Sequence, residues 1–138
     1  MTRPATAYRS GRHCVFLLHA HLVFTPKYRR KVFRGVHLNA LREVFAKVCA
    51  DFEVKLVEFD GQTDHVHLLV NYPPHVQLST LVNSLKGVSS RLLRKNFPGL
   101  KRHYLRGRLW SRSYFAASVG GAPIAILRQY IEQQKTPT

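Results

Sequence analysis

The chain has 138 residues, which suits one domain, and its 45% hydrophobic and 21% charged content is that of a globular protein rather than a disordered one. No apolar run is long enough to span a bilayer, and no leader-like apolar segment follows the N-terminus, so a soluble, cytoplasmic protein with no membrane partner is expected. The 22 Lys and Arg against 7 Asp and Glu, a formal net charge of +15, indicate a nucleic-acid partner.

The charges are unevenly distributed along the chain. No acidic residue precedes Glu43, none lies between residues 65 and 131, and six of the seven acids fall within residues 43–64. Two long basic stretches therefore flank an acidic middle, as expected for a groove that follows a phosphate backbone. Composition does not distinguish DNA from RNA. Cys14 and Cys49 have no metal-ligand spacing and are interpreted as two reduced thiols.

The first part of the chain predicts an arm, a strand and a basic turn. Residues 1–12 have the composition of a loose basic arm. Residues 14–24 are rich in β-branched and aromatic side chains with alternation, which predicts a strand. Residues 27–34 (KYRRKVFR) form a basic, turn-like stretch that leads into a helix.

The middle of the chain predicts a helix and a hairpin. Residues 37–52 carry apolar side chains at helical spacing. Residues 54–59 alternate as a strand, the Asp-Gly pair at 60–61 supplies a turn, and residues 64–71 form the second strand. Two prolines at 73–74 end that strand.

The last part of the chain predicts a helix, a strand and a helix. Residues 78–97 form a long amphipathic helix with its basic residues outward, and the Pro-Gly pair at 98–99 ends it. Residues 109–119 form the last strand. The Gly-Gly pair at 120–121 breaks the chain, and a final helix covers residues 123–134.

The order of these elements is β-α-β-β-α-β with an appended C-terminal helix. It predicts one α+β domain over residues 1–138, a ferredoxin-like or RRM-like antiparallel sheet with two helices on one face. In that topology the first and third strands are central neighbours. The appended helix, which carries a tyrosine, is free to lie across the other face.

The stretch DHVHLLV, residues 64–70, is the most informative for chemistry. On a strand, His65 and His67 point to one face while Val66 and Leu68 point into the core. Two imidazoles side by side form half of a divalent-metal site. Two histidines on a solvated or hydrogen-bonded face remain an equal alternative when the pair is considered alone.

A second pair, His19 and His21, repeats this spacing on the first strand. Because that strand neighbours the third, His21 is a candidate to lie beside the metal ligands or to contact DNA. Asp64 is a candidate to support the ligands. A zinc hydrolase is disfavoured, because no HExxH, no cysteine-rich zinc motif and no Asp-His after the His65–His67 pair is present.

The final helix supplies two further polar residues. Tyr130 and Gln134 lie one turn apart on the same face, at the border of an apolar stripe. Alone, such a tyrosine is more often an ordinary packing contact. Beside a histidine pair, the Gln134 amide oxygen is a candidate third metal ligand. The Tyr130 phenol is then a candidate to lie beside a phosphate bound to that metal.

Together with these residues, the chain resembles the single-tyrosine His-hydrophobic-His (HUH) transposases of the insertion sequence 200/605 group. The resemblance covers nearly the whole chain and is carried by LVFTPKYRRKVF, DHVHLLV, LKGVSSR, LWSRSYF and YIEQQ in this order. It implies that His65 and His67 bind the metal, that Gln134 is the third ligand and that Tyr130 is the nucleophile. The implied cell is bacterial or archaeal, with the protein at the nucleoid when it acts.

The resemblance also implies the reaction. Attack by a side-chain oxygen conserves the cut bond in a covalent ester, here a 5′-phosphotyrosine beside a free 3′-hydroxyl. A phenol with a pKa near 10 is a weak nucleophile, and a divalent metal on the phosphate offsets this. The imidazole and amide ligands suit Mg²⁺ or Mn²⁺. The implied partners are single-stranded DNA with hairpins near the element ends and a second copy of the chain, whose histidines the tyrosine helix can serve.

The basic and aromatic residues supply candidates for DNA contacts. Phosphate contacts are expected from Lys27, Arg29, Arg30, Lys31, Arg34, Lys86, Arg91 and Arg94. Stacking on bases is the candidate role of Tyr28, Tyr104, Trp110, Tyr114 and Phe115, although core packing is the preferred interpretation of Trp110 and Phe115.

Two rival functions remain at this point. A non-catalytic RRM-like nucleic-acid-binding protein would need stacking rings on its central strands, where DHVHLLV places histidines. A domesticated relative that cuts repeated chromosomal hairpins would share the active-site residues. The hairpin, the cleavage site and the target sequence are not readable from the chain.

Overall fold

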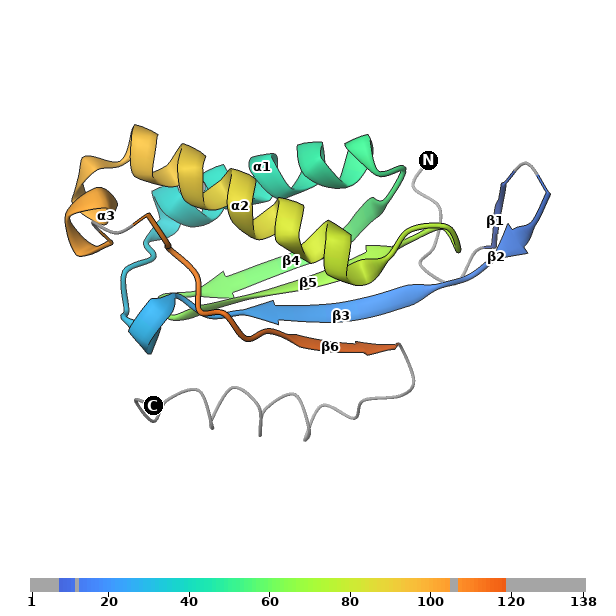
Figure 1. Ribbon diagram of the computed structural model, residues 1–138, viewed down its shortest axis with the longest axis horizontal. Helices are drawn as coiled ribbons and strands as arrows, with labels where there is room; N and C mark the ends of the chain where they lie inside the picture. The colour runs from blue at the N-terminus through green and yellow to red at the C-terminus, as the bar shows by residue number, and fades with distance from the viewer. Residues whose placement is uncertain (1–7, 12, 105–106, 119–138) are drawn as a thin grey trace.

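A four-stranded antiparallel sheet carries two long helices on one face (Figure 1). The computed structural model describes residues 8–11, 13–104 and 107–118. The sheet order is β4-β5-β3-β6. Its strands are β3 (His19–Phe24), β4 (Lys55–Gln62), β5 (His65–Asn71) and β6 (Phe115–Ser118). The helices are α1 (Gly35–Asp51) and α2 (Leu78–Asn96).

The predicted α+β fold is confirmed. The first and third predicted strands, β3 and β5, are central neighbours and pair antiparallel, with Val23 opposite His67 and Phe24 opposite Val66. The four smaller elements are β1 (Arg9–Ser10), β2 (Val15–Phe16), η1 (Lys27–Arg29) and α3 (Pro98–His103). The predicted final helix lies outside the described residues.

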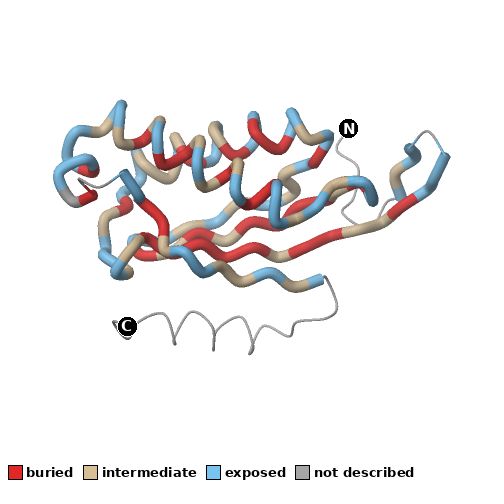
Figure 2. The backbone as a smooth tube through the Cα atoms, viewed as in Figure 1, coloured by how far each residue is buried: buried red, intermediate tan, exposed pale blue. Residues whose placement is uncertain are grey.

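The core lies between the sheet and the two helices. On the central strands, Leu22, Val66 and Leu68 are fully buried, as the alternating pattern predicts. The helices bring apolar side chains to the same layer, among them Phe45 of α1 and Leu85 of α2. Figure 2 shows these buried stretches along β3, β5 and the inward sides of both helices.

The hairpin between β4 and β5 differs from the prediction. The turn expected at residues 60–61 is wrong: β4 continues to Gln62, and the chain turns at Thr63 and Asp64. Gly61 pairs with Val66 inside the ladder. A Cβ on Gly61 would lie 2.6 Å from the Cδ2 of Leu38 in α1, so this glycine permits the helix to approach the sheet rather than forming the turn.

The expected N-terminal arm is also wrong over part of its length. Arg9 and Ser10 form β1, which pairs with β2. The Arg9 guanidinium donates to the side chain of Asn71 at 2.6 Å and to the carbonyl of Glu53 at 2.9 Å, and these bonds hold it against the sheet. The rest of the predicted arm, apart from residues 8 and 11, is not described.

Two predicted strands are shorter than expected. Residues 14–24 form two strands, β2 and β3, rather than one. In the segment predicted as the last strand, pairing with β3 is confined to residues 115–118, and Trp110 makes only an isolated bridge to Pro26. Residues 109–114, the connector before β6, are instead held by side chains of α2.

Candidate active site

His65 and His67 lie on the face of β5 that points away from the helices. The alternating residues Val66 and Leu68 are fully buried beneath the helices, which fixes the two imidazoles on the opposite face. Both histidines are half-buried. This juxtaposition is the one that the DHVHLLV pattern predicts.

Asp64 lies next to this pair and contacts it. Its Oδ1 accepts a hydrogen bond from Nδ1 of His65 at 2.9 Å, and its Oδ2 accepts one from Nε of Arg29 at 2.9 Å. Burial alone would raise the pKa of Asp64, but the hydrogen bonds from His65 and Arg29, with the Arg29 charge, outweigh it and hold the pKa below its ordinary value. The ionised carboxylate therefore fixes Nδ1 of His65 as a donor and leaves its Nε2 available.

Arg29 reaches Asp64 because of an unusual backbone turn. Tyr28 and Arg29 have φ values of 63° and 47°, in the left-handed region that non-glycine residues rarely adopt. The Arg29 side chain is 6% exposed, whereas Tyr28 is 63% exposed. Nη1 of Arg29 is buried without a hydrogen-bond partner among the described residues. Backbone strain of this kind persists where surrounding contacts hold the residues in place, and here the ion pair between Arg29 and Asp64 does so.

His21 approaches the pair from the neighbouring strand. Its Nδ1 lies 2.8 Å from Nε2 of His67, and the two rings stack with centroids 5.0 Å apart. Burial, and secondly the nearby His21, lower the pKa of His67, against the opposing charges of Glu58 and Asp60. His67 is therefore a neutral imidazole at physiological pH, the form that binds metals.

His19 has a different environment. It is buried, and its Nε2 lies 3.3 Å from Nδ2 of Asn71. Burial, and secondly His21, lower its pKa. The second histidine pair is thus divided: His21 joins the candidate site, and His19 belongs to a polar contact at the other end of the strand.

The described residues supply two metal-competent imidazoles but not a complete site. Within residues 8–11, 13–104 and 107–118, no group of three or more His, Cys, Asp or Glu side chains is placed to hold a metal ion. A complete site needs another ligand. Tyr130 and Gln134, predicted to be the nucleophile and that ligand, lie outside the described residues.

The expected DNA-contacting residues near the N-terminus gather around the strained turn. Lys27 and Arg30 lie over the exposed ring of Tyr28, at 5.2 and 5.3 Å from its centroid. A cavity of 650 Å³ is lined by residues from this loop, the start of α1 and α3. Its lining residues are Arg30, Lys31, Val32, Arg34, His37, Gly99 and Leu100.

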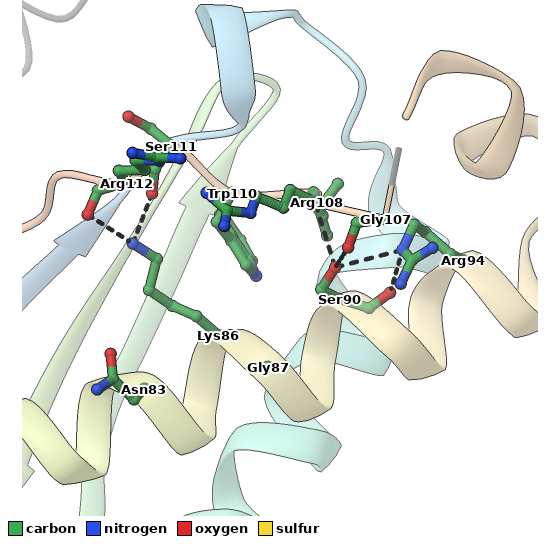
Figure 3. Close-up of a pocket in the computed structure, with 11 residues that line it drawn as sticks. Asn83, Lys86, Gly87, Ser90, Arg94, Gly107, Arg108, Trp110, Ser111 and Arg112 are labelled. Atoms are coloured by element: carbon green, nitrogen blue, oxygen red, sulfur yellow. Dashed lines mark hydrogen bonds between the residues drawn. The ribbon is translucent and has the colours of Figure 1, made fainter. Parts of the chain in front are cut away.

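Lys86 differs from the other basic candidates. Its ammonium donates to the carbonyls of Ser111 and Arg112 (Figure 3). It also donates to the carbonyl of Ser113, so it does not stand free on the outer face of α2. Burial lowers its pKa to about 8, whereas the three carbonyls favour its charged form. Helical spacing predicts an outward lysine here, but the connector before β6 covers it.

The same helix face holds the connector through two buried serines. Ser89 accepts a hydrogen bond from the indole of Trp110 at 2.8 Å, and Ser90 accepts one from the backbone N–H of Leu109 at 3.1 Å. Contacts between LKGVSSR and LWSRSYF therefore explain why the first segment carries two serines at buried positions. Ser90 lines a basic cavity of 320 Å³ together with Lys86, Arg94, Arg108 and Arg112 (Figure 3).

The aromatic candidates divide by burial. Trp110 is 4% exposed and packs against Phe24 and Phe33, which confirms core packing. Tyr104 is 3% exposed, so the expectation that it stacks on bases is wrong for this structure. Among the five stacking candidates, Tyr28 alone is an exposed large side chain.

Across the described residues, no helix is long and apolar enough to cross a membrane.

Comparisons with known proteins identify the family of the chain. The profile of the family described as "Transposase IS200 like" matches residues 14–134. The chain is 36% identical to the transposase for insertion sequence element IS200 of Salmonella typhimurium, over 83% of this chain and 74% of that protein. It is 32% identical to the ISDra2 transposase TnpA of Deinococcus radiodurans, over 91% of this chain and 90% of that protein.

Solved structures show the same fold. The crystal structure of a candidate transposase from Deinococcus radiodurans superposes with a TM-score of 0.84 at 32% identity, covering 91% of this chain and 97% of that one. A tyrosine transposase bound to a REP hairpin shares the fold, with a TM-score of 0.57 at 15% identity, covering 96% of this chain and 69% of that one. The family profile and the two relatives above 30% identity place this chain in the IS200-like transposase family.

Proposed function

We propose that this transposase cuts and rejoins single-stranded DNA by metal-assisted transesterification through Tyr130. The observation that carries the proposal is the pair His65 and His67 on the outer face of a central strand, with Asp64 bound to Nδ1 of His65. An ordinary solvated histidine pair would not need a buried, ionised carboxylate with its own arginine partner.

The proposed ligands of the metal are His65, His67 and Gln134, and the proposed ion is Mg²⁺ or Mn²⁺. The neutral imidazole of His67 and the Nε2 of His65, which Asp64 does not contact, fit this role. When bound, the ion draws charge from the non-bridging oxygens of the scissile phosphate. Because these ligands are neutral, they leave the charge of the ion undiminished for the substrate.

The proposed covalent step belongs to Tyr130. Its phenolic oxygen forms a bond to phosphorus while the bond from phosphorus to the 3′-oxygen breaks, and the phenol proton balances the leaving 3′-hydroxyl. The products are a 5′-phosphotyrosine and a free 3′-hydroxyl. Rejoining reverses the step: a 3′-hydroxyl attacks the phosphotyrosine and regenerates the phenol.

The proposed substrate is single-stranded DNA that folds into hairpins near the ends of an insertion sequence. The exposed Tyr28 ring between Lys27 and Arg30 supports a surface for unpaired bases and phosphates. We further propose a homodimer in which the tyrosine helix of one protomer can serve the histidines of its partner.

A protein–DNA adduct tests the reaction. Labelled single-stranded DNA copied from the segments that flank the gene is incubated with the protein and Mg²⁺ or Mn²⁺, then separated on a denaturing gel. We expect a protein-linked strand that disappears with EDTA and in Tyr130→Phe. Tyr8→Phe, which changes an exposed tyrosine, is the matched control and should retain the adduct.

Two other results would contradict this proposal. If the DNA binds but gives neither cleavage nor an adduct, the catalytic proposal is wrong and a binding-only role replaces it. An adduct that persists in Tyr130→Phe would assign the nucleophile to another residue.

A further inference from the structure

His21 lies against His67 at the centre of the sheet, and the proposed reaction does not use it. Nδ1 of His21 and Nε2 of His67 are 2.8 Å apart, and the ring planes differ by 20°. In the register of β3 and β5, His21 lies opposite Leu69 and Val23 opposite His67. The two imidazoles are therefore diagonal neighbours on one face, held by the most central pair of strands.

The contact restricts which nitrogen of His67 can bind a cation. A hydrogen bond between two ring nitrogens contains one proton, so one ring donates and the other accepts. If His21 donated, the neutral His67 ring would use its Nε2 lone pair on His21 and carry its proton on Nδ1. No lone pair would then remain for a metal. If His67 donates from Nε2, its Nδ1 lone pair stays available.

We propose that His21 is a positioning residue: its Nδ1 accepts the Nε2–H of His67 and so presents Nδ1 of His67 to the metal. This inference rests on the proposed function. Asp64 has the matching role for His65, because it accepts the Nδ1–H and leaves Nε2 free. Each ligand ring is then fixed through one nitrogen and open at the other, as supporting hydrogen bonds commonly arrange in metal sites.

His19 provides the matched control on the same strand. It has the same chemistry and alternation, but its Nε2 contacts Asn71 rather than His67. A change at His19 therefore removes a histidine from β3 without touching a proposed ligand. His21→Asn keeps an acceptor oxygen near the place of Nδ1, whereas His21→Phe keeps a ring and removes the acceptor.

The first readout is Mn²⁺ affinity, measured by calorimetry on the full chain without DNA. We expect His21→Phe to weaken Mn²⁺ binding about tenfold or more, the range found when supporting partners of metal ligands are removed. His21→Asn should recover most of this loss, and His19→Asn should bind as the wild type does. Thermal unfolding and metal-free DNA binding identify any variant that fails to fold.

The contrary mechanism predicts the opposite sign. If His21 competes with the metal for Nε2 of His67, His21→Phe binds Mn²⁺ more tightly, and the positioning role is overturned. The second readout is nitrogen NMR of the metal-free wild type. It should find the His67 proton on Nε2, and finding it on Nδ1 would overturn the inference without any metal measurement.

The two proposals fail separately. A wild type that binds no Mn²⁺ and forms no adduct refutes the proposed function, and the role of His21 falls with it. A wild type that does both, while His21→Phe matches its Mn²⁺ affinity, refutes only the positioning role.

Discussion

Ser89 and Trp110 form a buried polar contact on which the connector before β6 depends. Ser89 donates to the carbonyl of Leu85 at 2.6 Å and accepts from the Trp110 indole at 2.8 Å. Ser89→Ala leaves the indole N–H unpaired in a site that is fully buried. We expect a loss of about 1–2 kcal/mol in the free energy of unfolding, measured by urea denaturation, since an unsatisfied buried donor outweighs the better helix propensity of alanine.

Ser79→Ala is the control for this prediction. Ser79 is an exposed residue of the same helix, and its change should stay within about 0.5 kcal/mol of the wild type. Equal effects of the two substitutions would show that the Trp110 contact contributes nothing measurable.

At the scale of residues, alternation along the strand was enough to predict the face of His65 and His67, because a period of two depends only on local geometry. The partner of Asp64 could not be predicted. Arg29 is 35 positions away, and it reaches the carboxylate through two left-handed residues that no glycine marks in the sequence. The ion pair leaves the Arg29 side chain 6% exposed, so its predicted role as a phosphate contact is wrong for this structure.

At the scale of elements, two glycines have opposite structural roles. A Cβ on Gly61 would meet Leu38 at 2.6 Å and Val66 at 3.3 Å, whereas one on Gly87, inside α2, would meet nothing within 4 Å. We expect Gly61→Ala to destabilise the protein by about 1 kcal/mol through overpacking. Gly87→Ala should stabilise it by about 0.5–1 kcal/mol through helix propensity. Urea denaturation of both variants measures the difference in sign.

The Leu38 methyl is the end of a flexible side chain, so a double variant checks the cause. Leu38→Ala should remove most of the additional cost of Gly61→Ala, because the two side chains share one space. Additive effects, or a Gly61→Ala variant as stable as the wild type, would contradict the close approach of α1 to β4.

The connector before β6 explains why one element was predicted with the wrong length. Its large apolar and aromatic side chains favour a strand, yet only residues 115–118 pair with β3. Lys86, Ser89 and Ser90 bind the preceding backbone and the Trp110 indole, so side chains of α2 replace a strand partner. Side-chain contacts that replace strand pairing leave no periodic pattern in the sequence, so the length of this strand could not be predicted. The helices have apolar side chains that repeat at helical spacing, and they end within about two residues of their predicted bounds.

At the scale of the whole molecule, the acidic residues are concentrated in one part of the chain. Most acids lie on α1 and the β4–β5 hairpin, whereas the cavity beside the strained turn and the cavity along α2 are lined by Arg and Lys. No Asp or Glu lines either cavity. A phosphate backbone is expected to follow these basic surfaces. His65 and His67 lie on the acidic hairpin itself, on the face of the sheet that points away from the helices.

Two exposed lysines test this division of charge. Lys31 lines the basic cavity, whereas Lys47 lies on α1 one turn from both Glu43 and Asp51. Each phosphate contact to single-stranded DNA contributes about 0.7 to the slope of log affinity against log salt concentration. We expect Lys31→Gln to weaken DNA binding and to reduce that slope by about 0.7, since it removes one such contact. Lys47→Gln removes the same formal charge and should leave the slope unchanged. Equal slopes for both variants, measured by fluorescence anisotropy over a salt series, would mean that net charge rather than this surface determines DNA binding.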